Sequence, residues 1–421
     1  ILINPSDIIL NDTTWNMHQS KIELTPDIVT VKNFYFNHEN QNLQINGHTS
    51  RSDEDSITVH FSDLRLGYIS DILNQKNITF DGVADGDIYL FRLFNHPYYR
   101  GGLNILDAAI NDYTIGDLGV TSAWQEDKKC IAFNTTLDSH LPDNTKAHSD
   151  IFGGIFLGDD SLYIEGNLKE VDLKFLRKYI GSVMQNNTGT VCGTVKAYGN
   201  FGNIGLDGVA YVKDMRFDID YLKTSYSLSD TVYMTPTSFR LNQTPVYDSE
   251  HNFGVVSGLV LHNGFKDFKF AVDINCKNLL ALNTKEQDNE TFYGKAYAKG
   301  NVKISGTPNE VNFDINLRSM PNTKITIPIG TYANASNSDF ITFVESPENM
   351  TPDALRKKRR SRIQKIEENK KSKTQMNIDI NLEATRDATI QLIMDARQGD
   401  MMKGNGSGNL HITYSTKESG M

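Results

Sequence analysis

The sequence lacks any long apolar run. No stretch of eighteen consecutive apolar residues occurs, so no segment is predicted to cross a bilayer as a helix. The chain opens on Ile1, without a starting Met and without the charged and apolar regions of a signal peptide. Both features suggest a piece excised from a longer protein, whose missing end could hold a membrane anchor.

Potential metal and disulfide ligands are also scarce. Cys130, Cys192 and Cys276 are widely spaced and odd in number, with no CxxC pair. This pattern predicts small buried hydrophobic residues rather than a disulfide framework. The ten His are scattered and form no HExxH motif, so no metal site is predicted.

Positive charge is in the minority. The 42 Lys and Arg face 52 Asp and Glu, which gives a net charge of −10. The negative electrostatic field of such a protein repels phosphates at long range, which excludes nucleic acid as a partner. The basic run at 356–373 contains almost only charged and polar residues, and it predicts a solvated insertion looped out of a sheet. A contact with anionic lipid headgroups or with an acidic partner is the alternative.

Motifs for catalysis are missing as well. No Gly-x-Ser-x-Gly elbow occurs. The glycines from Gly404 to Gly408 lack the Lys-Ser/Thr of a phosphate loop and precede a strand pattern, so they predict a tight β connection. The acidic pairs, such as Asp159 with Asp160, cannot be placed at glycosidase separation from sequence alone. We therefore predict no catalytic residue, no metal and no cofactor.

What the sequence does contain is alternation. Apolar and polar residues alternate over 311–317, 325–329, 378–382 and 410–412, and Asn, Asp and Gly clusters separate such runs. Period-two alternation places one set of side chains on each face of a sheet. Many short strands with frequent turns predict an all-β architecture. The 38% hydrophobic content suits a sheet with one wetted and one apolar face.

A pattern of Asp followed by a glycine pair occurs three times, at spacings of roughly a hundred residues. The copies run from Asp63 to Gly82 and Gly86, from Asp172 to Gly193 and Gly199, and from Asp273 to Gly294 and Gly300. Long-range self-similarity indicates stacked units and an elongated molecule. We predict an N-terminal β segment (1–62), three repeat units (63–171, 172–272 and 273–349), a charged insertion (350–375) and a C-terminal β segment (376–421).

Two short helices are predicted within this array. Apolar residues recur at helical spacing after Asp63 and again after Asp172, and each Asp would cap the first turn. The apolar positions are Leu64, Tyr68, Ile69, Ile72 and Leu73 in the first copy and Leu173, Leu176, Ile180 and Val183 in the second. The third copy alternates instead, so it is predicted to be extended.

The apolar strand faces leave two architectures open. In a sandwich they would pack against a second sheet. In a single curled sheet they would line a continuous trough, and such a face would need an apolar occupant because exposing it costs ~25 cal/mol per Å². The modest hydrophobic fraction favours the trough, but the residue pattern alone leaves the choice nearly even.

A family resemblance favours the trough. The chain resembles the C-terminal region of the TamB family, the translocation and assembly module proteins of Gram-negative envelopes, and most closely the Bacteroidetes-type members. The resemblance is carried by 292–306 and 322–329, supported by 222–230, 260–268 and 399–410. It runs in order from about residue 60 to the end, and the family's terminal segment and N-terminal membrane anchor are absent from this sequence.

The resemblance implies a fold, a location and partners. The fold would be a β-taco, an elongated, repetitive curled sheet that encloses a half-pipe groove and carries a few short helices. The protein would lie in the periplasm, span from inner to outer membrane in its full-length form, and conduct phospholipid between them without catalysis. Its partners would be phospholipid acyl chains, a TamA-like outer-membrane barrel protein, and the inner membrane through the absent anchor.

The strands with the clearest alternation supply the groove candidates. Their apolar residues are predicted to face inward and solvate acyl chains: Val302, Ile304, Val311, Phe313, Ile315, Leu317, Ile325, Ile327, Ile329, Ile378, Ile380, Leu382, Ile390, Leu392 and Met394.

Two other hypotheses remain at this point. One is a scaffold whose sheet edges assist insertion and assembly of outer-membrane β-barrel proteins by β-augmentation, together with the TamA-like partner. The other is a surface adhesin or glycan-binding rod, which would bind through exposed aromatics such as Tyr98 and Tyr99.

Overall fold

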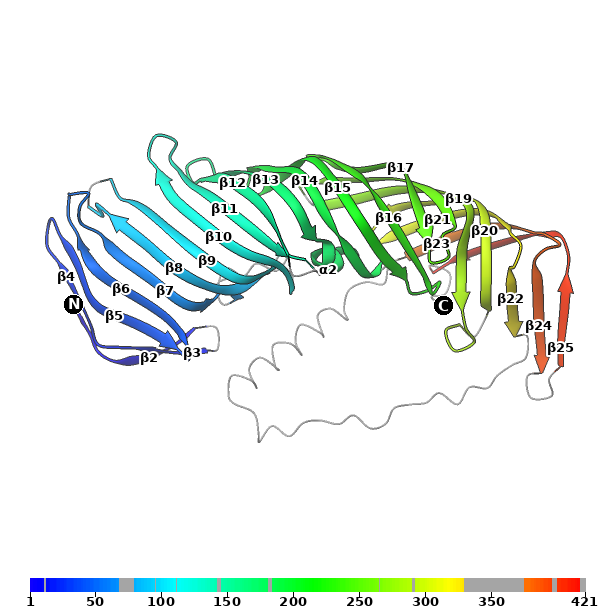
Figure 1. The fold of residues 1–421 in the computed structure, drawn as a ribbon, viewed down its shortest axis with the longest axis horizontal. Helices are drawn as coiled ribbons and strands as arrows, with labels where there is room; N and C mark the ends of the chain where they lie inside the picture. The colour runs from blue at the N-terminus through cyan, green and yellow to red at the C-terminus, as the bar shows by residue number, and fades with distance from the viewer. Residues whose placement is uncertain are drawn as a thin grey trace, which may run out of the picture.

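The molecule is an elongated rod made of one curled β-sheet (Figure 1). The computed structural model describes residues 1–10, 13–67, 79–94, 96–110, 112–141, 145–180, 184–264, 266–289, 292–328, 375–395 and 400–416. Strands follow one another along the rod in nearly their sequence order, so the N-terminal strands and the C-terminal strands lie at opposite ends. The all-β prediction and the elongated curled sheet are confirmed.

Most of the rod is an antiparallel meander in which each strand pairs with the next. It runs through β5 (Val29–His38), β6 (Gln41–Thr49), β7 (Ile57–Arg65), β8 (Phe80–Phe91), β9 (Tyr98–Ile110), β10 (Tyr113–Gln125), β11 (Cys130–His140), β12 (Lys146–Phe156), β13 (Ser161–Asp172), β14 (Gln185–Asn200), β15 (Asn203–Ile219), β16 (Thr224–Thr235), β17 (Ser238–Asp248), β18 (Phe253–Asn263), β19 (Lys266–Thr284) and β20 (Tyr293–Thr307). The three Asp residues of the sequence repeat lie on β7, β13 and β19, six strands apart. The unit boundaries themselves stay a prediction.

At each end of the rod, one strand shares its pairing between two shorter strands. The short strands are β1 (Leu2–Ile3), β2 (Ser6–Leu10), β3 (Thr13–Met17) and β4 (Ser20–Leu24), and then β21 (Glu310–Ser319), β22 (Lys324–Pro328), β23 (Gln375–Ala384), β24 (Thr389–Asp395), β25 (Asp400–Asn405) and β26 (Gly408–Ser415). β5 pairs with both β3 and β4, and β20 pairs with both β21 and β22. The sheet therefore divides into two flanks, β21–β23–β26 and β22–β24–β25.

A line of β-bulges creases the sheet. On every second strand from β5 to β9 and from β13 to β17, one residue has a positive φ, and its N–H donates to a side chain of the next strand. The pairs are Asn33 to Asn46, Asp63 to Asp85, Asp107 to Asp117, Glu170 to Cys192, Asp214 to Ser229 and Gln243 to Ser257. A bulge removes an N–H from the ladder and bends the strand, so each displaced donor needs an acceptor. Repeated along the rod, these bends fold the sheet lengthwise.

The prediction that Asp63 caps a helix is wrong. Asp63 lies inside β7 at a bulge with φ 52°, and it does not cap a helix. Short polar residues tolerate this left-handed conformation, so the same residue type serves bulges as well as caps. The helical positions predicted at 68–73 lie outside the described residues.

The second predicted helix is confirmed. A 3₁₀ turn, η1 (Leu173–Leu176), leads into α2 (Arg177–Ile180), and the Asp172 carboxylate accepts the N–H of Lys174 at 2.8 Å. Val183 lies outside the described residues. The third copy is extended, as predicted, because Asp273 lies within β19.

The interior is a series of apolar clusters along the rod rather than one central core. The largest described cluster contains Leu137, Val171, Leu173, Val191, Ala210 and Val212. Smaller clusters form around Ala84 and around Cys276. On β16, Tyr226 donates its hydroxyl to the Leu280 carbonyl of β19 at 2.9 Å, although β17 and β18 lie between these strands in the pairing order. Such a contact requires the sheet to curl.

Candidate functional site

The predicted groove residues on β20, β21 and β23 lie in continuous rows across paired strands. One row joins Val256, Ile274, Val302, Ile315, Ile380 and Ile412, each directly opposite the next. The adjacent row joins Val272, Ile304, Phe313, Ile378 and Tyr414, and a third contains Leu317, Leu382 and Leu410. Val311 lies opposite Met376. These positions therefore form a strip of apolar side chains that crosses the strands.

The second flank carries its own, shorter set. Ile325 lies opposite Ile390, and Ile327 lies opposite Leu392 in the parallel pair β22–β24. Ile325 also faces Gly294 of β20, which shares strand parity with Val302 and Ile304, so both flanks present their apolar residues on one face of the sheet. Met394 follows on β24, and Ile329 lies outside the described residues.

This apolar face is sheltered, whereas the opposite face is in solvent. On β21 the apolar residues from Val311 to Leu317 are half-buried, and the polar residues between them are exposed. The same alternation holds for Ile378, Ile380 and Leu382 on β23. At the end of the rod the shelter decreases, because Ile390 is 41% and Met394 is 49% exposed. The structure thus places the candidates on an open, apolar trough, and their role as lipid contacts stays a prediction.

Two parallel strand pairs build this part of the trough. β21 pairs with β23 and β22 with β24 at the same interval of 65 residues, as in Val311 with Met376 and Lys324 with Thr389. On the polar face Asn377 donates to Asn312 at 2.9 Å and Asn381 to Asn316 at 3.0 Å. This repeat is not among the sequence predictions, although the shared residues Asp-Ile-Asn-Leu at 314–317 and 379–382 signal it. The 350–374 part of the predicted charged insertion falls between the copies and lies outside the described residues.

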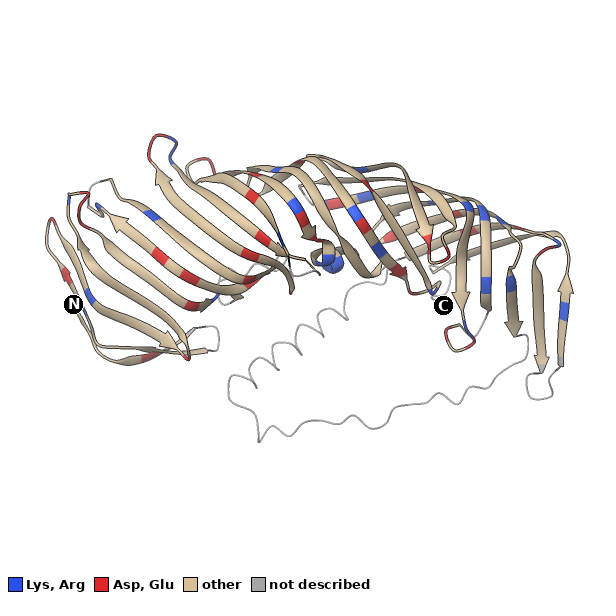
Figure 2. Cartoon of the chain, in the orientation of Figure 1, with Lys and Arg blue, Asp and Glu red and all other residues tan. Residues whose placement is uncertain are grey.

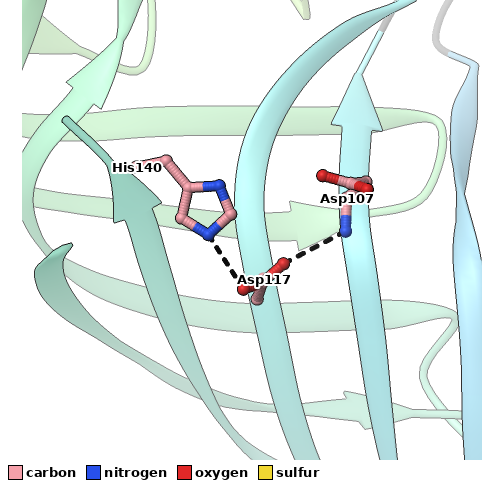
Figure 3. Close-up of side chains that lie close together, drawn as sticks. All are labelled: Asp107, Asp117 and His140. Atoms are coloured by element: carbon pink, nitrogen blue, oxygen red, sulfur yellow. Dashed lines mark hydrogen bonds and ion pairs between the residues drawn. The ribbon is translucent and has the colours of Figure 1, made fainter. Parts of the chain in front are cut away.

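A charged cluster lies on the polar face of the N-terminal half. Figure 3 shows Asp117 between the His140 ring and the backbone N–H of Asp107. The three groups lie close enough to share a cation. However, Asp117 already accepts from Lys146 Nζ at 2.8 Å, His140 Nε2 at 2.9 Å and Asp107 N at 3.1 Å. Both carboxylate oxygens are therefore engaged, and the arrangement is that of an ion-pair network on a bulge.

This network has a measurable pH signature. The hydrogen bond from Lys146 outweighs partial burial and lowers the pKa of Asp117 to about 2. A depressed carboxyl pKa stabilises the fold above the unfolded-state value, and the contribution disappears as the pH falls through the folded-state value. We expect Asp117→Asn to lower the free energy of unfolding by about 1 kcal/mol at pH 7, with allowance for solvent screening.

Urea unfolding of Asp117→Asn between pH 7 and pH 2 measures this effect. The gap between wild type and variant should shrink as the pH falls from about 4 towards 2. Asp150→Asn, which removes an exposed carboxylate on β12, serves as the control. A gap that stays constant over this range would contradict the assigned role of the Asp117 charge.

Tyr98 and Tyr99, the aromatic residues predicted for a glycan-binding rod, are not exposed. Tyr98 stacks on Phe91 with ring centroids 4.8 Å apart and donates to Asp53 at 3.1 Å. The Tyr99 hydroxyl lies 2.7 Å from Ser122 Oγ. Both rings are half-buried, so the prediction that they are exposed was wrong.

Charge also distinguishes the two faces of the sheet. Figure 2 shows charged residues spread along the strands and basic residues at α2. On β20 the basic residues Lys295, Lys299 and Lys303 share one parity, opposite to the parity of Val302 and Ile304. Within the described residues no helix is long and apolar enough to cross a membrane.

An open, curled β-sheet with one apolar and one charged face defines a groove protein of the β-taco class. Residues 244–420 match the family model described as the TamB C-terminal domain. The C-terminal two fifths of the chain therefore carry a TamB C-terminal domain. The comparison with curated proteins and the comparison with solved structures each gave no match.

The match defines the function at a coarse level. TamB family proteins are non-enzymatic proteins of the Gram-negative envelope that take part in the translocation and assembly module, in which they work with TamA. The matched range begins within β17 and includes the two flanks of the C-terminal trough. The candidate apolar strip thus lies inside the part of the chain that carries the family relationship.

Proposed function

We propose that the protein conducts phospholipid between the inner and outer membranes, with acyl chains in the apolar trough and headgroups at its polar mouth. In this proposal the protein works in the periplasm, and no residue performs chemistry. A lipid would follow its gradient along a surface that has no deep binding minimum.

The observation that carries the proposal is the row from Val256 to Ile412. It crosses six directly paired strands without a charged residue. An apolar face left in water costs ~25 cal/mol per Å², and acyl chains would remove that cost along the whole row. Because the row crosses the strands from β18 to β26, an acyl chain could pass from one strand to the next without meeting a charge.

Lipid analysis of the purified protein tests the proposal directly. We expect phospholipid to co-purify with the chain and to appear by mass spectrometry after organic extraction. Delipidated protein should expose the trough and bind an apolar dye more strongly than the loaded form. Recovery of a folded, lipid-free protein whose strip from Val302 to Leu382 is shielded from dye would contradict the proposal.

The second candidate function is assembly of outer-membrane β-barrel proteins with the TamA-like partner. The observation that favours it is the end of the sheet: among the described strands, β26 pairs only with β23 and β25 pairs only with β24. A strand with one unpaired side can accept another strand by β-augmentation. Crosslinks from Leu410 or Ile412 to client strands, without lipid recovery, would favour this function over lipid conduction.

A further inference from the structure

The η1–α2 segment, Leu173–Ile180, lies on the apolar face of the sheet at the middle of the rod (Figure 1). Leu173 is 3% exposed and belongs to the largest cluster, and Leu176 packs against it. The cluster also takes in Leu118 of β10, Ile151 of β12 and Leu228 of β16. The segment therefore covers side chains that would otherwise line the trough.

One contact shows that the segment reaches across the sheet. The guanidinium of Arg177 lies over the ring of Tyr113, 5.4 Å from its centroid. Tyr113 is on β10, whereas the segment leaves from the end of β13, and β11 and β12 lie between these strands. Three strand spacings amount to roughly 14 Å. Tyr113 lies beyond Asp117, the first β10 residue paired with β11, so the segment reaches β10 near the ends of β11 and β12.

Hydrogen bonds between Arg177 and Asn187, here called the clamp, hold the segment in place. Arg177 donates to the side-chain oxygen of Asn187 at 3.1 Å and to its backbone carbonyl at 2.9 Å. Asn187 is fully buried and donates back to the Leu173 carbonyl at 2.9 Å. Helical segments this short are not stable alone in water, so η1–α2 depends on these contacts. Removing them would uncover the apolar face beneath.

We propose that Leu173–Ile180 is a gate that closes the trough between β10 and β16, and that an acyl chain displaces it by competing for the same apolar surface. The inference rests on the proposed lipid conduction. Without displacement, the gate separates the trough into an N-terminal stretch and a C-terminal stretch. Arg177 and Asn187 set how readily the gate opens.

Photo-crosslinking at three positions tests the gate. A photoreactive residue is placed at Ile151 beneath the segment, at Ile88 of β8 on its N-terminal side, or at Ile315 of β21 on its C-terminal side. Each version of the full chain is incubated with vesicles of phosphatidylethanolamine and phosphatidylglycerol and then irradiated. Arg177→Ala and Asn187→Ala release the clamp, and Lys178→Ala, which removes a similar charge from an exposed position on the same helix, is the control.

We expect release of the clamp to raise lipid capture at Ile151 by about tenfold, because charge-assisted hydrogen bonds of this kind have that effect on an equilibrium. Capture at Ile88 and Ile315 should stay unchanged, which also reports that the variants are folded. Amide exchange over Leu173–Ile180 should accelerate when vesicles are added to the wild type.

The outcomes separate the gate from the proposed function. Equal capture at Ile151 in the wild type and both clamp variants, with lipid still captured at Ile315, overturns the gate and leaves lipid conduction standing. Absence of capture at Ile315 in every version removes lipid conduction and the gate with it. An increase for Lys178→Ala equal to that for Arg177→Ala would assign the effect to charge and overturn the role of the clamp.

Discussion

Ile315→Asp is expected to block lipid passage along the trough. Ile315 lies at the centre of the longest apolar row, opposite Val302 on one side and Ile380 on the other. A carboxylate there would be desolvated by every acyl chain that passes, and no cation lies opposite it in this row. The cost of about 3 kcal/mol corresponds to roughly a hundredfold fall in transfer rate.

The measurement is transfer of a fluorescent phospholipid between donor and acceptor vesicles. Ser305→Asp is the matched control because it adds the same charge to the exposed face of the neighbouring strand β20. Transfer by this control should equal that of the wild type. If Ile315→Asp transferred lipid at the wild-type rate, the trough around β21 would not be the path.

Gly300→Ala is expected to lower the urea midpoint strongly. Gly300 has φ 141°, a conformation that residues with a Cβ rarely adopt, and an added Cβ would lie 2.1 Å from the Asn316 carbonyl oxygen. The strand pair β20–β21 would have to separate locally. We expect a loss of about 3 kcal/mol in the free energy of unfolding.

Gly202→Ala provides the comparison for this effect. Gly202 lies in the turn between β14 and β15, and an added Cβ would meet nothing within 4 Å. Its urea midpoint should match or slightly exceed that of the wild type, because Ala reduces the freedom of the unfolded chain. Equal midpoints for the two variants would show that the Gly300 backbone can relax.

The repeat glycines show which structural features a glycine pattern predicts and which it does not. The six glycines that close the three copies all have positive φ and lie inside β8, β14 and β20. Their spacing predicted a repeat, but their location on the strand next to each Asp required the pairing register. A glycine signals an unusual backbone conformation, and it does not tell whether that conformation is a turn or a close strand approach.

The two helix predictions show that one residue type can occupy two different local structures. Asp172 caps a turn while Asp63 occupies a bulge, although both precede apolar residues at helical spacing. Caps and bulges both offer an N–H that needs an acceptor, so the residue preference is shared. Which one forms depends on whether the neighbouring strand supplies the partner, as Asp85 does for Asp63.

The sequence by itself determined the all-β class, the apolar and polar faces of each strand, the short helix after Asp172 and the TamB relationship. These follow from period-two alternation, local capping and motif order, which act over a few residues. Only the tertiary structure decided the crease, the two flanks at the C-terminal end and the contact of Leu173–Ile180 with β10. Those features depend on which strands pair, because hydrogen bonds between distant residues fix the register and the curl.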